Sequence, residues 1–224
     1  APTGITETAS LTVAIGPDHL YETFSGLLLS AESSLEIASY SLENVSLTLA
    51  IAEKALAGVS VTVLLEGETV GGLSREGKWA AKVISDAGGK VYFMAGSPRR
   101  YRFQHAKYAI IDGRLALLGS ENLSPNGMPS DPKNDGTLGH RGVYIATDAP
   151  SVVEKLKSLF WTDADPSRPD VADCTSRPDL CSPPPIYRVY LPLVMRGCPG
   201  EGCGGGERLT YRVKFPSPLG LEGS

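Results

Sequence analysis

The chain has 224 residues, 42% of them hydrophobic, which is enough for one domain with an appendage or for two small domains. The formal net charge of −4 argues against a long basic face that grips nucleic acid through many phosphates. The longest apolar runs fall well short of the ~18 residues that span a bilayer, so we expect no transmembrane helix.

The first residues point to an exported protein. The segment Ala1-Pro2-Thr3-Gly4 consists of small residues without an initiator Met, as is common after removal of a signal peptide. A shortened chain would begin in the same way, so both interpretations stay open.

Helices and strands are expected to alternate over the first hundred residues. Apolar residues recur at helical spacing from Leu20 to Leu28, and Asp18 can cap that helix. Residues 59–65 are apolar on both faces, as in a strand buried within a sheet. The expected elements are a helix from Asp18, a strand over Ser34–Ser39, a helix over 46–57, a strand over 59–65, a helix over 76–87 and a strand over 91–94. This alternation of helices and strands predicts an α/β fold with helices flanking a central sheet.

A hairpin is expected next. One strand runs from His105 to Ile111 and another over residues 115–118, and Asp112-Gly113 between them is a strong turn signal. A two-residue loop would pair odd positions of one strand with even positions of the other. Lys107 would then face Leu118 or Ser120, and His105 would face Ser120 or Asn122.

These side chains suit a phosphodiester. A neutral imidazole at His105 can form a covalent phosphoryl species, and the ammonium of Lys107 can balance the non-bridging oxygens. Ser120 and Asn122 can add neutral donors. Asp112, at the turn, is better placed to anchor the hairpin or balance Lys107 than to attack a substrate.

The strings His105-Ala106-Lys107-Tyr108-Ala109-Ile110-Ile111-Asp112 and Gly119-Ser120-Glu121-Asn122 resemble the HxKxxxxD and GSxN motifs of the phospholipase D superfamily. The similarity extends over roughly residues 16 to 161. It implies a mixed sheet between helices, and a two-step phosphoryl transfer that uses no metal or cofactor. One motif histidine is then the nucleophile, a second is the general acid, and His105, Lys107 and Asp112 are the catalytic motif residues.

The chain departs from that family's pattern in two ways. Only one motif copy is present, because neither His19 nor His140 is followed by a lysine two places on. The strand expected at residues 142–145 also lacks the carboxylate that small nuclease members use to orient the partner histidine. We therefore expect a second motif-bearing domain, either a later repeat, which we favour, or a second copy of the chain.

Two further segments could serve the site. The basic cluster Arg99-Arg100-Tyr101-Arg102 could steer an anionic substrate, with Arg102 as a substrate contact, or could be a solvated loop. Residues 121–140 form a long polar loop, typical of a lid or a substrate-selecting wall. Within it, residues 131–136 resemble a calcium loop, but Lys133 stands at a ligand position, so we reject a metal there.

The last part of the chain differs in composition. Residues 163–224 hold 10 of the 17 prolines and 8 of the 25 glycines, so we place a catalytic domain over 1–162 and a linker or extension over 163–224. One strand-like piece, Tyr187 to Met195, interrupts it. All four cysteines lie there, and their spacing predicts the disulfides Cys174–Cys181 and Cys198–Cys203, which place the protein outside the cytosol.

Three functions remain open. The leading hypothesis is an exported phosphodiesterase or phosphatidyltransferase of phospholipase D type, acting on phospholipid rather than nucleic acid, with peripheral membrane contact. The second is a nuclease that dimerises to supply the second histidine. The third is a non-catalytic module that binds phosphate.

Overall fold

The computed structural model describes residue 4, residues 6–129 and residues 139–182. In these ranges eight strands form one mixed sheet, in the order β1-β7-β6-β5-β2-β3-β4-β8. The strands are β1 (Leu11–Ile15), β2 (Ser34–Ser39), β3 (Ser60–Glu66), β4 (Lys90–Met94), β5 (Tyr108–Ile111), β6 (Leu115–Gly119), β7 (Val143–Thr147) and β8 (Val171–Asp173). The α-helices are α1 (Leu20–Leu29), α2 (Val45–Leu56), α3 (Arg75–Asp86) and α4 (Pro150–Asp163). The predicted α/β class with a central mixed sheet is confirmed.

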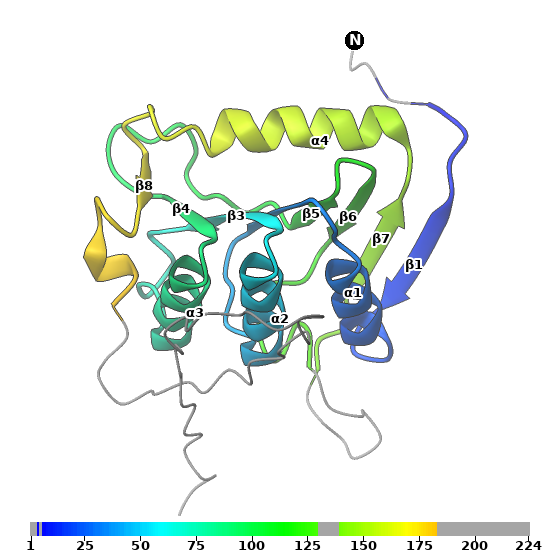
Figure 1. Cartoon of the computed structure of the whole chain (residues 1–224), viewed down its shortest axis with the longest axis horizontal. Helices are drawn as coiled ribbons and strands as arrows, with labels where there is room; N and C mark the ends of the chain where they lie inside the picture. The colour runs from blue at the N-terminus through cyan, green and yellow to red at the C-terminus, as the bar shows by residue number, and fades with distance from the viewer. Residues whose placement is uncertain (1–3, 5, 130–138, 183–224) are drawn as a thin grey trace, which may run out of the picture. The chain divides into compact units, whose positions relative to one another are not determined.

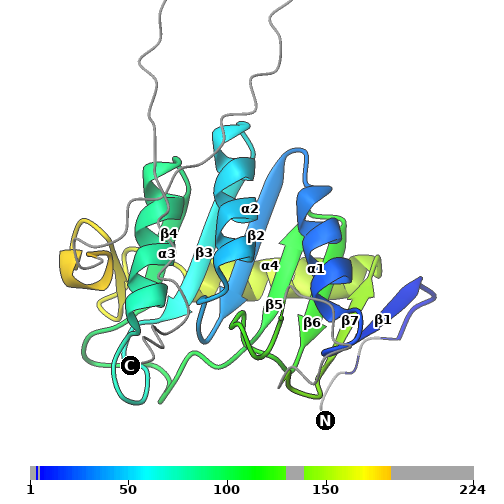
Figure 2. The same cartoon turned by 90° about the horizontal axis from the view of Figure 1, so that it is seen from below.

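Helices cover both faces of the sheet. One face carries α1, α2 and α3, and α4 lies across the other (Figure 1). Figure 2 shows the face with three helices, with α4 visible behind the strands. Because β2, β3 and β4 run parallel, their carboxyl ends meet at one edge. That edge is where open α/β sheets place their ligands.

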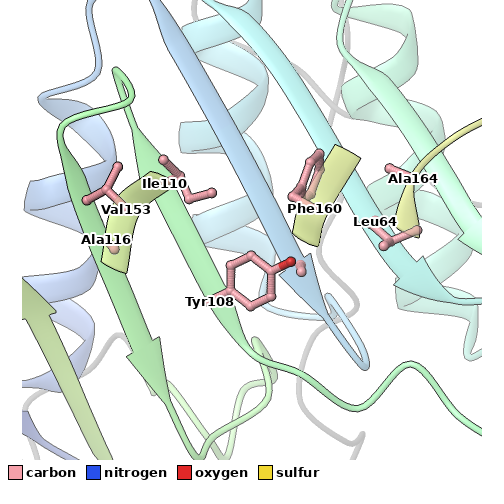
Figure 3. Close-up of a cluster of buried hydrophobic side chains, with 8 residues drawn as sticks. Leu64, Tyr108, Ile110, Ala116, Val153, Phe160 and Ala164 are labelled. Atoms are coloured by element: carbon pink, nitrogen blue, oxygen red, sulfur yellow. The ribbon is translucent and has the colours of Figure 1, made fainter. Parts of the chain in front are cut away.

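The strand β5 is buried on both sides. Tyr108 and Ile110 pack with Val153 and Phe160 of α4 in a cluster of buried side chains (Figure 3). Side chains of a strand alternate between faces, so Ala109, which is also fully buried, points toward the opposite layer. Contacts on both faces therefore hold in place the strand that follows the motif histidine.

The first helix begins differently from the expectation. Its N-cap is His19, which makes no side-chain capping hydrogen bond. The Asp18 carboxylate instead accepts a hydrogen bond from Arg141 Nη1 at 2.8 Å, so the predicted cap is wrong. The next two helices do have side-chain caps, in which Asn44 and Ser74 each accept a bond from the backbone N–H three residues on.

The hairpin contains one residue more than expected. Asp112 and Gly113 form the turn with φ angles of 52° and 61°, and Arg114 N donates to Ile111 O at 3.0 Å. Strand pairing resumes between Ile111 and Leu115, which leaves Arg114 as an extra residue. Odd positions therefore pair with odd ones. The predicted pairing of Lys107 with Leu118 or Ser120 is wrong, because Gly119 N donates to Lys107 O at 3.0 Å.

The sheet continues past the expected domain boundary. Helix α4 ends at Asp163, close to the boundary predicted between 162 and 163, but β8 then pairs with β4 at the edge of the sheet. A disulfide joins Cys174 to Cys181, as predicted. Residues up to Ser182 form one compact unit, so the extension begins later than residue 163. Cys198, Cys203 and the strand expected at 187–195 lie outside the described residues.

In the described ranges, no helix combines the length and the apolar character needed to cross a bilayer. The longest, α4, has 14 residues.

Candidate active site

The motif histidine and lysine lie at the edge formed by the carboxyl ends of the parallel strands. Strand β5 runs antiparallel to β2 and begins at Tyr108, opposite Ala38 near the end of β2. His105 and Lys107 immediately precede β5 and are outside it, contrary to the predicted strand over 105–111. The topology thus places both side chains where a phosphate could approach from solvent.

The two side chains contact each other. Lys107 Nζ lies 3.1 Å from His105 Nδ1 and 3.2 Å from Nε2, and it donates to His105 O at 2.9 Å. His105 is exposed, whereas Lys107 is buried, with 8% of its surface accessible. The Tyr40 ring packs edge-on against the imidazole, with centroids 5.1 Å apart. The exposed imidazole thus lies beside an ammonium group that the backbone carbonyl of His105 holds in place.

The environment favours a neutral histidine. Desolvation lowers the pKa of His105 below its ordinary value, and the charge of Lys107 lowers it further. Desolvation also lowers the pKa of Lys107, while the carboxylate of Glu121 acts in the opposite direction. A neutral imidazole keeps a nitrogen lone pair, so near neutral pH His105 has the form that a nucleophile requires.

A buried carboxylate fixes the loop that leads to His105. Glu66, at the end of β3, is fully buried and accepts two bonds of 2.7 Å from Arg99 Nη2. It also accepts a bond of 2.6 Å from the backbone N–H of Gln104. The Gln104 side chain in turn accepts a bond from Ala106 N at 2.7 Å. The backbone is therefore held on both sides of the histidine.

Most of the basic cluster is used inside the protein. Arg99 pairs with Glu66 and with Glu68, the latter at 3.1 Å. Arg100 Nε donates to both oxygens of the buried Asp170, at 3.1 and 2.9 Å. Arg102 is exposed and lies over the Phe103 ring, 5.7 Å from its centroid. Of the three arginines, Arg102 alone remains a candidate for contact with substrate.

Asp112 lies at the tip of the hairpin, away from His105 and Lys107. Strand β5 separates it from Lys107, and its four residues rise by about 13 Å. One carboxylate oxygen accepts bonds from Ser33 N, Ser33 Oγ and Ser34 N at 2.7, 2.9 and 3.0 Å, and Glu32 N donates to both oxygens. These bonds hold the pKa of the carboxyl far below its ordinary value. The structure supports the anchoring role, and it does not bring Asp112 to the catalytic pair.

We expect Asp112→Asn to lower the free energy of unfolding by about 2 kcal/mol at pH 7, because charge-assisted hydrogen bonds are lost. Since the folded-state pKa is depressed, this stabilisation is complete above the unfolded pKa of about 4 and disappears as the pH falls below it. Urea unfolding at pH 7 and pH 3 measures the difference, which should shrink at pH 3. The exposed Asp18→Asn is the control, with a change within about 0.5 kcal/mol. An equal loss at both pH values would contradict this explanation.

Ser120 and Asn122 form no hydrogen bond with His105 or Lys107 in the part of the chain that the structure describes. The Ser120 hydroxyl accepts a bond from Val143 N at 3.2 Å and donates to Glu121 Oε1 at 3.1 Å. Asn122 Oδ1 is buried and has no hydrogen-bond partner among the described residues. Their contact with substrate stays a prediction.

Position 119 of the motif requires glycine for a steric reason. A Cβ on Gly119 would lie 2.0 to 2.3 Å from ring atoms of Tyr144, so the aromatic ring occupies the place of a side chain. The Tyr144 hydroxyl then donates to Glu121 O at 2.7 Å. Tyr144 therefore holds the segment after β6 against β7 through packing and a hydrogen bond.

Sequence reasoning did not single out Tyr40, Glu66 or Glu121 as parts of the site. Glu66 gave a usable signal, because a charged residue directly ends the apolar run of residues 61–65. Tyr40 and Glu121 gave none. In the described ranges no group of three His, Cys, Asp or Glu side chains could hold a metal ion. The rejected calcium segment, residues 131–136, and most of the expected lid lie outside those ranges.

Comparisons with known proteins place the fold. The family described as "Cardiolipin synthase, PLD-like domain" matches residues 25–163. The phospholipase D family member Nuc from Salmonella typhimurium is similar in structure, with a TM-score of 0.59 at 17% identity, over 74% of this chain and 98% of Nuc. For NucT from Helicobacter pylori the TM-score is 0.56 at 22% identity, over 70% and 96% of the two chains. The phosphatidylserine synthase of Haemophilus influenzae Rd KW20 gives 0.51 at 12% identity, over 79% and 42%. No curated protein sequence matches.

Proposed function

The chain belongs to the family of phospholipase D-like domains, because the family match spans more than half of its length, and we propose that it is a phosphodiesterase or phosphatidyltransferase acting through a phosphohistidine. The observation that carries this proposal is the pair of an exposed His105 and a buried Lys107 whose Nζ lies 3.1 Å from the imidazole. The nucleophile and the cation that balances the phosphate are then in place before substrate binds.

The reaction has two steps. A ring nitrogen of His105 attacks phosphorus as the bond to the leaving alkoxide breaks, and Lys107 balances charge on the non-bridging oxygens. A general acid protonates the alkoxide. Water or an alcohol then attacks the phosphorus of the phosphohistidine, releases the product and frees the imidazole. His105 cannot be nucleophile and acid in one step, so a second motif-bearing domain must supply the acid.

An exposed apolar strip marks where that domain would dock. Val13 pairs with Ile145, and Ile15 with Val143, so these side chains share one face of the sheet, and Leu11 extends the strip. Leu11, Val13, Ile15, Val143 and Ile145 are 39 to 67% exposed. Ser120 N donates to Val143 O at 3.1 Å, so one end of the strip lies next to the segment that follows β6. Its occupant in this proposal is the domain that brings the second histidine.

The second domain could be a later repeat or a second copy. The Pro- and Gly-rich segment that follows the domain favours the repeat, because it can bridge two halves. The coverage of Nuc and NucT favours the copy, since this domain matches almost their whole chains. In a homodimer the two His105 side chains would face each other across an isologous interface.

We favour phospholipid over nucleic acid as substrate. The net charge is −4, and Arg99 and Arg100 are engaged by buried carboxylates, which leaves little free positive charge near the site for a polyanion. The Cys174–Cys181 disulfide supports a location outside the cytosol.

Trapping the covalent intermediate tests this function. The natural polypeptide, isolated from its source, is mixed with vesicles of phosphorus-labelled phosphatidylglycerol or with labelled single-stranded DNA, and the reaction is quenched at alkaline pH. We expect label on His105 with the phospholipid. Label from DNA only would favour the nuclease, and label from neither would leave the phosphate-binding module. The mass of the polypeptide also tells whether a second motif follows.

Chelation gives a separate prediction. We expect the rate to be unchanged in excess EDTA, because the mechanism uses histidine and lysine in place of a metal-bound nucleophile. Phospholipid turnover measured before and after dialysis against EDTA checks this. A strict requirement for added metal would refute the proposed chemistry.

A further inference from the structure

Glu121 occupies the variable position of the Gly119-Ser120-Glu121-Asn122 segment, and its carboxylate is turned into the protein. Its side chain is only 14% exposed. One oxygen accepts from Ser120 Oγ at 3.1 Å, and the other lies 3.2 Å from His140 Nδ1. The Tyr144 hydroxyl holds the Glu121 backbone through its carbonyl. Two neighbours, Ser120 and His140, therefore contact the carboxylate, and Tyr144 fixes the backbone that carries it.

The next strand leaves room for this carboxylate. A Cβ on Gly142 would lie 2.1 Å from Cγ, 2.4 Å from Oε1 and 2.5 Å from Cδ of Glu121. The Glu121 side chain thus fills the space that a side chain at position 142 would take. Strand β7 carries no acidic residue, yet the Glu121 carboxylate occupies the place of a side chain at Gly142, directly before β7.

The hairpin register brings Glu121 toward the catalytic lysine. Gly119 N bonds to Lys107 O, so Glu121 follows the partner of Lys107 by two residues. Diagonal neighbours at that spacing have Cβ atoms about 7 Å apart, which long side chains can bridge. Among the described residues, the other groups that contact Lys107 Nζ are the two ring nitrogens and the carbonyl of His105 and the Tyr40 ring, none of them an anion.

We propose that Glu121 is a positioning residue that keeps the buried Lys107 charged, and that glycine at position 142 makes this placement feasible. This inference rests on the proposed function only for its catalytic consequence. Burial disfavours an ammonium, and a carboxylate within reach offsets that cost. Without Glu121, a larger fraction of Lys107 loses its proton at alkaline pH and can no longer balance the phosphate. The same carboxylate also contacts the largely exposed side chain of His140.

Titrating Lys107 by NMR in Glu121→Gln tests the inference without any substrate. We expect the pKa of Lys107 to fall further below its ordinary value, because the carboxylate charge that opposes desolvation is removed. Among the described residues, the groups that face Glu121 are the Lys107 ammonium, the His140 imidazole and Tyr144. His140→Asn is therefore the matched control, and it should leave the Lys107 titration nearly unchanged. An identical Lys107 titration in Glu121→Gln and in the unmodified protein would overturn the inference.

A swap of the carboxylate gives a second test. Gly142→Asp alone should lose activity by collision with Glu121, and Glu121→Ala alone should move the alkaline limb of the rate profile to lower pH. The double variant should return the limb toward its original position. If the alkaline limb of the double variant stays where it is in Glu121→Ala, a carboxylate in the space beside residue 142 does not stabilise the charge of Lys107. Absence of turnover in the unmodified protein would refute the proposed function, while the NMR titration would still decide the role of Glu121.

Discussion

Replacing His105 by asparagine is expected to reduce turnover to background. The imidazole forms and breaks the bond to phosphorus. Among the described residues that contact His105, Lys107 serves as the charge-balancing cation and the Tyr40 hydroxyl accepts a hydrogen bond from Val70 N at 2.9 Å, so neither replaces the nucleophile. The His105 side chain is exposed, and among the described residues its hydrogen-bond and ring contacts are with Lys107 and Tyr40, so the fold should be unaffected. Steady-state turnover and the covalent label measure the loss, and the unfolding midpoint checks the fold.

A matched control is available in the same chain. His140→Asn removes the same imidazole from a residue whose side chain is 60% exposed and bonds to Glu121. We expect this variant to retain phosphohistidine formation, because its ring does not contact His105 or Lys107. Full activity in His105→Asn would remove His105 from the mechanism. A loss of label in His140→Asn would mean that the acid or the nucleophile had been misassigned.

The elements that hold the site could be predicted where a local pattern decides the structure. The strand at Ser34–Ser39 was predicted with its observed bounds, and the next two helices within one residue, because periodicity and the glycine at 58 or 88 mark their ends. Strand β1 could not be placed, since its pairing with β7 joins residues 128 to 136 positions apart. Long-range pairing of this kind leaves no local signature.

The site itself was predictable as a motif but not as a geometry. The residue types at 105 and 107 pointed to phosphoryl transfer, yet one inserted residue, Arg114, reversed the parity and moved Ser120 away from its expected position. A two-residue and a bulged loop fit the same Asp-Gly signal, so sequence could not separate them. The ion pair of Glu66 with Arg99 joins residues 33 positions apart and could not be predicted from the sequence either. Buried polar partners are chosen by the three-dimensional fold.

Replacing Lys107 by methionine is expected to lower kcat by a factor of about 10² to 10³ or more, because one preorganised contact to the developing charge is removed. Methionine is the informative choice because Lys107 is buried and methionine keeps most of its apolar stem, while the charge and its contact with the Tyr40 ring are lost. The unfolding midpoint should fall little. Measuring kcat and KM separately decides how Lys107 acts.

The effects on kcat and on KM distinguish two possible roles of Lys107. If Lys107 stabilises the transition state, kcat and kcat/KM fall together, whereas an increase in KM alone would mean that it only attracts substrate. The pKa of His105 is lowered partly by the charge of Lys107, so in Lys107→Met it should rise toward its ordinary value. The acid limb of any residual activity should then move to higher pH, because a larger fraction of His105 is protonated and cannot attack. A residual pH profile with an unmoved acid limb would mean that the lysine charge does not reach the nucleophile.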